Sequence, residues 1–314
     1  MPISVLLTES YHPLLIETLR RDSRLQLNHV EKPTFEEILP FLKEAEVWIM
    51  RGAVPVTEKL LEAAMRLRLI IRAGSGIEHI DKEALRRRGI ELRHTPQANA
   101  TPVAEYVLAA LLVLARRLLP AHHALRESDK WLRRESIGRE LSELTVGIIG
   151  FGQNGSRTAH LLAALGARVL AYDKYKGGFG GLGVREVSLE EMYEEVDVLS
   201  LHVPLTPETQ RLVNQDFLAC FHRPIALINP ARGGVVDLVA VADALDTGRL
   251  WGLAMDTLPA EPPVLLSPRD REAWERIRRH PVAFLTPHIA GLTGQSELRL
   301  ARAVLRLLQS WLER

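Results

Sequence analysis

Short apolar runs alternate with amphipathic segments along most of this chain, and this alternation limits the folds open to it. Apolar runs that stop at a turn or polar residue are typical of buried parallel strands, and the amphipathic segments fit helices that cover the sheet. In the first part of the chain the predicted strands are Val5–Thr8, Leu25–Val30, Val47–Met50, Leu69–Arg72 and Ile90–Arg93. The predicted helices between them are Pro13–Arg21, Phe35–Glu44, Thr57–Met65 and Lys82–Arg88.

A second series of the same kind follows a long predicted helix at about Thr101–Arg117 and a charged arm, Pro120–Gly138. The last helix, Gln295–Leu312, comes after this series and is expected to return to the first domain. The sequence therefore predicts an α/β protein with two doubly wound parallel-sheet domains and a cleft between them. The expected domains are residues 1–98 with 289–314, and residues 99–288. The strands of the second series are Thr145–Ile149, Arg168–Tyr172, Val198–Leu201, Ile225–Ile228, Gly252–Met255 and Ala283–Leu285.

Charge and hydropathy exclude several classes of partner. The net charge is +1, so no overall field favours nucleic acid or an anionic membrane. No apolar run reaches the roughly 20 residues that cross a bilayer, and the first residues enter a strand pattern without a signal peptide, so a cytoplasmic location is expected. The single cysteine, Cys220, excludes an internal disulfide and is expected in the core. No spacing of Cys and His suggests a metal site.

A glycine triplet, Gly150, Gly152 and Gly155, stands directly between a predicted buried strand and a predicted helix, Ser156–Leu165. In this context the first glycine permits a tight turn, the second lets a pyrophosphate approach the backbone, and the third allows close helix–strand packing. The N–H groups around Gln153 and Asn154 would then face the phosphates at the start of the helix.

Asp173 ends the next predicted strand, about 20 residues after the triplet, where an acid hydrogen-bonds the adenosine ribose. Its charge would repel a 2′-phosphate, so we expect NAD rather than NADP, although Lys174 and Lys176 leave NADP to be tested. The glycine-rich loop 177–183 is expected to be a mobile segment beside the adenosine site.

Polar residues also follow three later strands, in the segments 228–237, 255–263 and 285–291. Ligands of open α/β sheets bind at such strand ends. Together with the segments 72–81, 95–105 and 202–208, they make the chain resemble the D-isomer-specific 2-hydroxyacid dehydrogenase family over essentially its whole length. The resemblance implies a flavodoxin-like substrate domain, a Rossmann NAD-binding domain and hydride transfer between nicotinamide and a 2-hydroxy acid, without a metal.

The resemblance implies that Arg232, Glu261 and His288 are catalytic. An imidazolium can protonate the developing alkoxide, a carboxylate can hold the ring and stabilise its charge, and a guanidinium can clamp the substrate carboxylate. His202 and His79 are interpreted as mainly structural, and Asp237 as the cap of a helix at Leu238–Leu245. The implied further cofactor contacts are Pro204, Ala231 and Asp256. A structural role for Asp256 is equally open. The implied substrate contacts are Arg51, Arg72, Gly74, Ser75 and Gly76.

Within the family the basic segments around Arg51, Arg72 and Arg134 are most similar to 3-phosphoglycerate dehydrogenases, where such groups receive a phosphate. Glyoxylate, hydroxypyruvate or another 2-hydroxy acid remains an alternative, as do phosphite or formate oxidation and an NAD-sensing, corepressor-like binding protein. Asn154 stands where the family commonly has an apolar residue, which puts the affinity for the dinucleotide in question. The resemblance further implies a homodimer that pairs through Thr101–Gly138.

Overall fold

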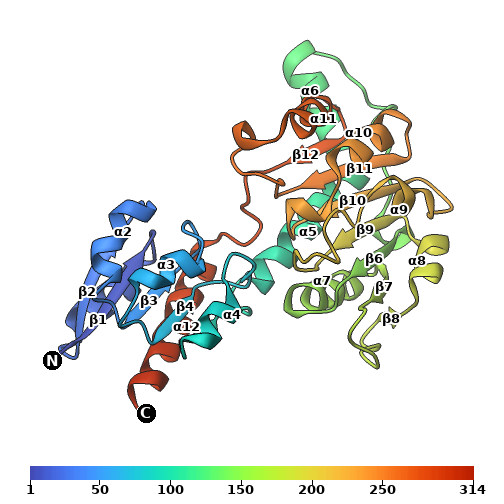
Figure 1. Ribbon diagram of the computed structural model, residues 1–314. Helices are drawn as coiled ribbons and strands as arrows, with labels where there is room; N and C mark the ends of the chain where they lie inside the picture. Colours follow the sequence, from blue (N-terminus) through green and yellow to red (C-terminus); the bar gives the residue numbers. More distant parts are fainter. The chain divides into compact units, whose positions relative to one another are not determined.

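The computed structural model describes all 314 residues, and these divide into two compact units. Met1–Asn99 together with Leu292–Arg314 form the first unit, and Ala100–Gly291 form the second (Figure 1). The sequence-based boundaries, after residues 98 and 288, lie near these two crossings. Both units are parallel sheets with helices on both faces, which confirms the predicted α/β class.

The first unit contains a five-stranded parallel sheet in the order β2-β1-β3-β4-β5. Successive strand residues point to opposite faces, so each apolar strand supplies two cores. Helices α1 and α12 pack on one face, and α2, α3 and α4 pack on the other. The elements are β1 Ile3–Thr8, α1 Pro13–Arg21, β2 Leu25–Val30, α2 Phe35–Leu42, β3 Val47–Met50, α3 Glu58–Ala63, β4 Leu69–Arg72, α4 Lys82–Arg87, β5 Glu91–His94 and α12 Gly294–Leu312.

The second unit contains a seven-stranded parallel sheet in the order β12-β11-β10-β9-β6-β7-β8. Its strands are β6 Thr145–Ile149, β7 Arg168–Tyr172, β8 Val184–Glu186, β9 Val198–Leu201, β10 Ile225–Asn229, β11 Leu250–Met255 and β12 Ala283–Leu285. Its helices are α5 Ala100–Ala115, α6 Leu118–Ser128, α7 Gln153–Ala164, α8 Leu189–Glu195, α9 Gln215–Ala219, α10 Leu238–Asp246 and α11 Pro268–Ile277. Short 3-10 turns occur at Leu141–Glu143, Gly233–Val235 and Pro263–Leu265.

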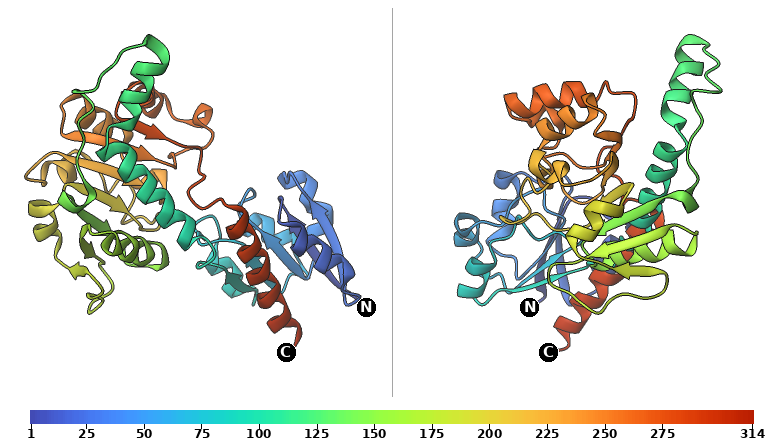
Figure 2. Two further views of the ribbon diagram at one scale, coloured as in Figure 1. Left: turned by 180° about the vertical axis from the view of Figure 1, so that it is seen from behind. Right: turned by 90° about the vertical axis from the view of Figure 1, so that its right-hand side faces the viewer.

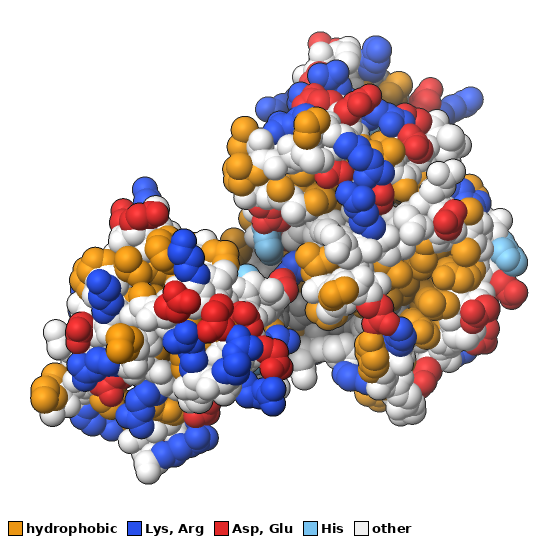
Figure 3. All heavy atoms as spheres, in the orientation of Figure 1, with side chains coloured by type: hydrophobic (Ala, Val, Ile, Leu, Met, Phe, Trp, Pro, Cys, Tyr) orange, Lys and Arg blue, Asp and Glu red, His pale blue; other side chains and the backbone are white.

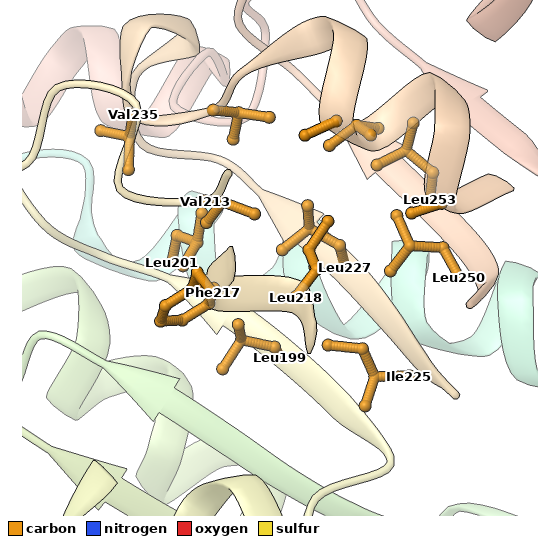
Figure 4. Packing of buried hydrophobic residues seen from close by; sticks show 14 of the residues in the cluster. Leu199, Leu201, Val213, Phe217, Leu218, Ile225, Leu227, Val235, Leu250 and Leu253 are labelled. Atoms are coloured by element: carbon orange, nitrogen blue, oxygen red, sulfur yellow. The ribbon is translucent and has the colours of Figure 1, made fainter. Parts of the chain in front are cut away.

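The two cores of this unit explain why its strands are almost uniformly apolar. Helices α5 and α7 cover one face of the sheet. On the other face Leu199, Leu227 and Leu253 of three adjacent strands meet the side chains of α9 and the segment around Val235 (Figure 4). Burial of such a side chain stabilises the fold by about 1.5–3 kcal/mol. The sheet is therefore fixed from both sides, and the strand ends that carry polar residues are held at one edge.

Local signals in the sequence set where several helices begin. Asp237 caps α10 by accepting a hydrogen bond from the Val239 N–H at 3.0 Å, as predicted. Thr34 and Glu37 form a reciprocal capping box at α2, and Thr293 with Ser296 does so at α12. Each cap contributes about 1 kcal/mol of helix stability.

The structure differs from the sequence-based prediction at Cys220. Cys220 is exposed, because it follows the last turn of α9, in which Phe217 and Leu218 take the buried positions. The predicted core position of Cys220 is therefore wrong. The arm begins as helix α6, which has no buried residue and stands clear of the sheet of its unit (Figure 2).

Charges of both signs are interspersed on the face shown in Figure 3, in keeping with the small net charge. Even the basic run Arg86–Arg88 is paired with the carboxylates of Glu83 and Glu58. None of the helices combines the length and the apolar character that crossing a bilayer requires.

Candidate active site

The turn after β6 has a backbone that only glycine fits. Gly150 has φ +95°, and a Cβ there would lie 2.6 Å from the backbone oxygen of His202. A Cβ on Gly155 would lie 1.9 Å from the oxygen of Gly150, which is far inside a van der Waals contact. These two glycines therefore bring the strand, the turn and α7 together as the sequence pattern predicts.

The start of α7 offers room and hydrogen-bond donors to a ligand. A Cβ built on Gly152 meets no atom within 4 Å, so the backbone there is open to close approach. Gly152 is also the N-cap, and no side chain caps the first N–H groups of the helix, at Gln153 and Asn154. The side-chain oxygen of Asn154 is buried and has no hydrogen-bond partner within the chain. The N–H groups at the start of α7 are donors that fit the pyrophosphate of a dinucleotide, whereas the Asn154 oxygen is an acceptor and adds nothing to phosphate binding.

Asp173 lies at the end of β7 and faces the glycine turn. Its carboxylate accepts hydrogen bonds from the N–H of Phe151 at 2.7 Å and the N–H of Tyr175 at 3.0 Å. Lys174 pairs with Glu208, and Lys176 donates to the backbone oxygen of Phe151 at 2.9 Å. Both lysines that could attract a 2′-phosphate are thus engaged, while the Asp173 charge stays at the turn.

We expect Asp173→Ala to relax the preference for NADH over NADPH. Removing the carboxylate removes its repulsion of a 2′-phosphate, and about 1.4 kcal/mol of lost repulsion changes the ratio of the two dissociation constants tenfold. Fluorescence titration with each cofactor measures that ratio without a substrate. Asp173→Asn is the matched control that keeps the shape and one acceptor oxygen but not the charge. An unaltered ratio in both variants would contradict the ribose assignment.

The glycine-rich loop 177–183 lies against the same turn. The ring of Phe179 stacks on the ring of Phe151 with their centroids 4.3 Å apart. The Phe179 N–H donates to the carboxylate of Glu186 at 2.9 Å, and Gly181 and Val184 exchange two backbone hydrogen bonds. The loop therefore lies beside the glycine turn, and its mobility and its place at the adenosine site stay predictions.

Arg232 follows β10 in a loop that buried groups hold in shape. Asn229 is fully buried; its side-chain amide donates to the Arg232 backbone oxygen at 2.9 Å and accepts from the Ala231 N–H at 3.1 Å. A Cβ on the next residue, Gly233, would lie 1.9 Å from the backbone carbon of Leu258. The loops that follow β10 and β11 are therefore packed directly against each other, which brings Arg232 near the segment of Glu261.

Glu261 and His288 form the pair that the resemblance implies. The Nδ1 atom of His288 lies 2.8 Å from a carboxylate oxygen of Glu261, and the other oxygen accepts from the Leu258 N–H at 2.9 Å. Burial acts to raise the pKa of Glu261, but the hydrogen bonds from His288 and Leu258 and the nearby charge of Arg232 together hold that pKa below its usual range. Because Nδ1 faces the carboxylate, Nε2 is the atom left to meet a substrate.

Asp256 fixes the backbone that carries His288. Only 1% of Asp256 is exposed, and its carboxylate accepts from the Thr286 hydroxyl at 2.6 Å and from the N–H groups of Ile289 and Ala290, both at 2.8 Å. The His288 N–H donates to the backbone oxygen of Asp256 at 2.7 Å. These bonds support the structural role that the sequence left open, while a cofactor contact by Asp256 stays a prediction. Thr286, which the sequence reasoning missed, links this network to the hydroxyl of Tyr106 at 2.8 Å.

Two further residues near the turn have local partners. The His202 ring lies 2.9 Å from the Ser200 hydroxyl, and desolvation lowers the pKa of His202 to about 3. His202 is therefore neutral at physiological pH and cannot serve as a proton donor, in agreement with its structural interpretation. The Pro204 oxygen accepts from the Thr209 hydroxyl at 2.6 Å, and its predicted cofactor contact is untested.

The predicted substrate residues lie in the first unit, after β3 and β4. Arg51 pairs with Glu297 of α12 and stacks over the ring of Tyr11 at 4.8 Å. The Glu9 carboxylate accepts from the N–H groups of Arg51, Gly52 and Ala53, each within 2.8 Å. The sequence reasoning missed Glu9, Tyr11 and Glu297, because nothing in a linear pattern joins residues so far apart.

Arg72 ends β4, and the loop of Gly74, Ser75 and Gly76 turns directly after it. Gly74 has φ +142°, and a Cβ there would lie 1.5 Å from a guanidinium nitrogen of Arg72. The structure thus brings the predicted substrate residues to one edge of the sheet of the first unit. Their contact with substrate stays a prediction, as does the cleft.

Comparison with known proteins adds to this geometry. The sequence profile described as "D-isomer specific 2-hydroxyacid dehydrogenase, NAD binding domain" matches residues 108–290. The chain is 34% identical to a D-3-phosphoglycerate dehydrogenase of Synechocystis over 267 residues, which are 84% of this chain and 46% of that protein. It is 33% identical to a hydroxypyruvate reductase of Thermotoga maritima, over 87% of this chain and 85% of that protein.

The chain spans about half the length of the phosphoglycerate dehydrogenases that it matches. Among solved structures it is similar to the D-lactate dehydrogenase of Aquifex aeolicus in complex with NAD and lactic acid. The TM-score is 0.87 at 31% identity, and the match covers 98% of this chain and 95% of that one. The two-domain fold and the NAD-binding unit are therefore shared with these relatives.

Proposed function

This chain belongs to the D-isomer-specific 2-hydroxyacid dehydrogenase family, and we propose that it is an NAD-dependent oxidoreductase that interconverts a D-2-hydroxy acid and its 2-oxo acid. The observation that carries the proposal is the His288–Glu261 pair at 2.8 Å. This pair lies on the loops after β11 and β12, next to the Arg232 loop, in the unit that also bears the glycine turn. A base, an acid partner and a guanidinium are thus present beside a dinucleotide fold.

Bound NADH would supply the hydride to the carbonyl carbon of the 2-oxo acid. His288 donates the proton from Nε2 to the carbonyl oxygen as that oxygen gains charge. Glu261 orients the ring through Nδ1 and stabilises the imidazolium before the transfer. Arg232 holds the substrate carboxylate with its planar fork of donors. In the oxidising direction His288 removes the hydroxyl proton.

Two substrates follow from different observations. Arg51 and Arg72 are basic residues at one edge of the first unit, and they support a phosphate-bearing acid such as 3-phosphoglycerate. Against this, Glu297 already pairs with Arg51. A phosphate group that binds Arg51 has to displace the Glu297 carboxylate, whereas an acid without a phosphate can leave this pair in place. This ion pair supports hydroxypyruvate or glyoxylate as the second candidate.

The test is NADH oxidation with a panel of 2-oxo acids: 3-phosphohydroxypyruvate, hydroxypyruvate, glyoxylate and pyruvate. Highest kcat/KM for the phosphorylated acid supports 3-phosphoglycerate, and highest kcat/KM for hydroxypyruvate or glyoxylate supports the smaller substrates. If the protein binds NADH but turns over none of these acids, the proposed dehydrogenase activity is overturned. That result would favour an NAD-sensing binding protein. Glu297→Gln, which frees Arg51 of its counter-ion, should shift the preference toward the phosphorylated acid if Arg51 receives the phosphate.

We also propose a cytoplasmic homodimer. The apolar side chains that α6 and the segment after it leave exposed support pairing through this region: Leu118, Leu125, Trp131 and Ile137. Arg134 in the same segment would then come to the substrate from the neighbouring subunit.

A further inference from the structure

We infer that the first unit has a second anion site, separate from the candidate active site, which binds a small phosphorylated molecule. The site is the groove of about 540 Å³ between residues 94–98, at and after the end of β5, and the outer face of α12. We call it the α12 groove. It contains none of the residues assigned above to catalysis, cofactor or substrate, and the inference does not depend on the proposed function.

Three arginines of α12 line the groove: Arg299, Arg302 and Arg306. Residues spaced by three, four and seven lie on one face of a helix, and seven residues rise about 10 Å. The charges therefore form a row along one wall. All three arginines are exposed, so this wall is open to solvent.

The charges of this row are not compensated within the chain. Arg302 and Arg306 are exposed and form no ion pair, and Nε of Arg299 donates to the Ala98 backbone oxygen at 3.2 Å. No Asp or Glu lines the groove. By contrast, Arg93 and Arg314 nearby are both paired with Glu91. A concave surface with three cations and no acid attracts anions.

The opposite wall has buried polar atoms without partners. Thr95 is 5% exposed, and its hydroxyl has no hydrogen-bond partner, nor has Nδ1 of His94. Buried polar groups are nearly always paired, because an unpaired one costs about 1–3 kcal/mol, so these two residues of the groove wall have hydrogen-bonding capacity that the chain itself does not use. A threonine hydroxyl and an imidazole N–H can both donate to a phosphate oxygen.

The size and lining of the groove indicate the class of ligand. Guanidinium groups bind phosphate through two parallel N–H bonds, and a row of three suits two or more negative charges better than one. Pro96, Ala98 and Leu307 add apolar surface for a carbon framework. A cavity of this volume is in the range of pockets that hold metabolites. The ligand class is therefore a small organic molecule with two phosphate groups or a diphosphate.

Calorimetric titration of the full chain, saturated with NADH so that phosphates cannot enter the dinucleotide site, tests the inference. The probes are inorganic pyrophosphate and fructose 1,6-bisphosphate at one low ionic strength, because exposed charges are screened by salt. The wild-type chain should bind at least one probe, and Arg302→Ala/Arg306→Ala should weaken that binding at least tenfold. The control Arg20→Ala/Arg21→Ala removes the same charge from two exposed positions on α1 of the same unit and should leave the affinity unchanged.

A second comparison separates this site from the candidate active site. Arg232→Ala should bind the probe as the wild type does, and Thr95→Val, which removes only the hydroxyl, should weaken binding less than the double arginine variant. Thermal melts check that the exposed substitutions leave the fold intact. The inference is overturned if neither probe binds, if the double variant binds as the wild type does, or if the control or Arg232→Ala weakens binding equally.

Discussion

His288→Gln should lower turnover about 10²- to 10⁴-fold while the dissociation constant of NADH changes little. Glutamine keeps a polar side chain of similar length, but it cannot transfer a proton from Nε2 to the substrate oxygen. The loop itself is held by Asp256, through the backbone of His288 and its two following residues, so the substitution leaves the loop in place. Steady-state kinetics on the best substrate of the panel and fluorescence titration of NADH measure the two effects separately.

Glu261→Gln is the companion variant for this prediction. It preserves a hydrogen bond to the ring but removes the charge that stabilises the imidazolium, so turnover should fall less than in His288→Gln.

The lowered pKa of Glu261 means that its carboxylate remains ionised in mild acid. The contribution of the pair is therefore present above the usual carboxyl range and is lost only as the pH falls through that lowered pKa. Unchanged turnover in His288→Gln would remove His288 from the mechanism.

Arg232→Ala should lower kcat/KM for the 2-oxo acid about 10³-fold, again with little change in NADH binding. Removing one partner of a buried, hydrogen-bonded charge pair costs about 2–5 kcal/mol, and each 1.4 kcal/mol is a factor of ten. The guanidinium is the group proposed to bind the substrate carboxylate. The loss should therefore fall mainly on kcat/KM for the 2-oxo acid and hardly on the affinity for NADH.

Arg232→Lys is the matched control, because it keeps the charge and loses the planar fork. It should recover part of the activity and leave a raised KM. Equal losses in substrate use and NADH affinity in Arg232→Ala would show that the residue shapes the cofactor site instead of clamping the substrate.

The sequence alone could predict features whose cause is local. Strands such as Val47–Met50 and Val198–Leu201 were predictable because fully buried parallel strands are mostly apolar runs bounded by turns. The glycine turn was predictable because the steric limits at Gly150 and Gly155 admit no other residue. Asp237 could be assigned as a cap because its partner lies two residues away.

Features that depend on long-range packing were not predictable. The Arg51–Glu297 pair joins residues from opposite ends of the chain, so the counter-ion that bears on substrate choice has no linear signal. Cys220 has the hydrophobic character of a core residue, yet the register of a short helix turns it to solvent. The short strand β8 follows a glycine-rich loop, and its three residues include two charges, which gave no strand pattern.

The discontinuity of the first unit also bears on the order in which the chain can fold during its synthesis. Leu300, Val304 and Leu308 of α12 complete the core on one face of the first sheet, yet they leave the ribosome only after the whole second unit has been made. The second unit is one uninterrupted segment and can fold as soon as Gly291 has emerged. The sheet of the first unit must therefore wait, with one apolar face only partly covered, until α12 has emerged as well.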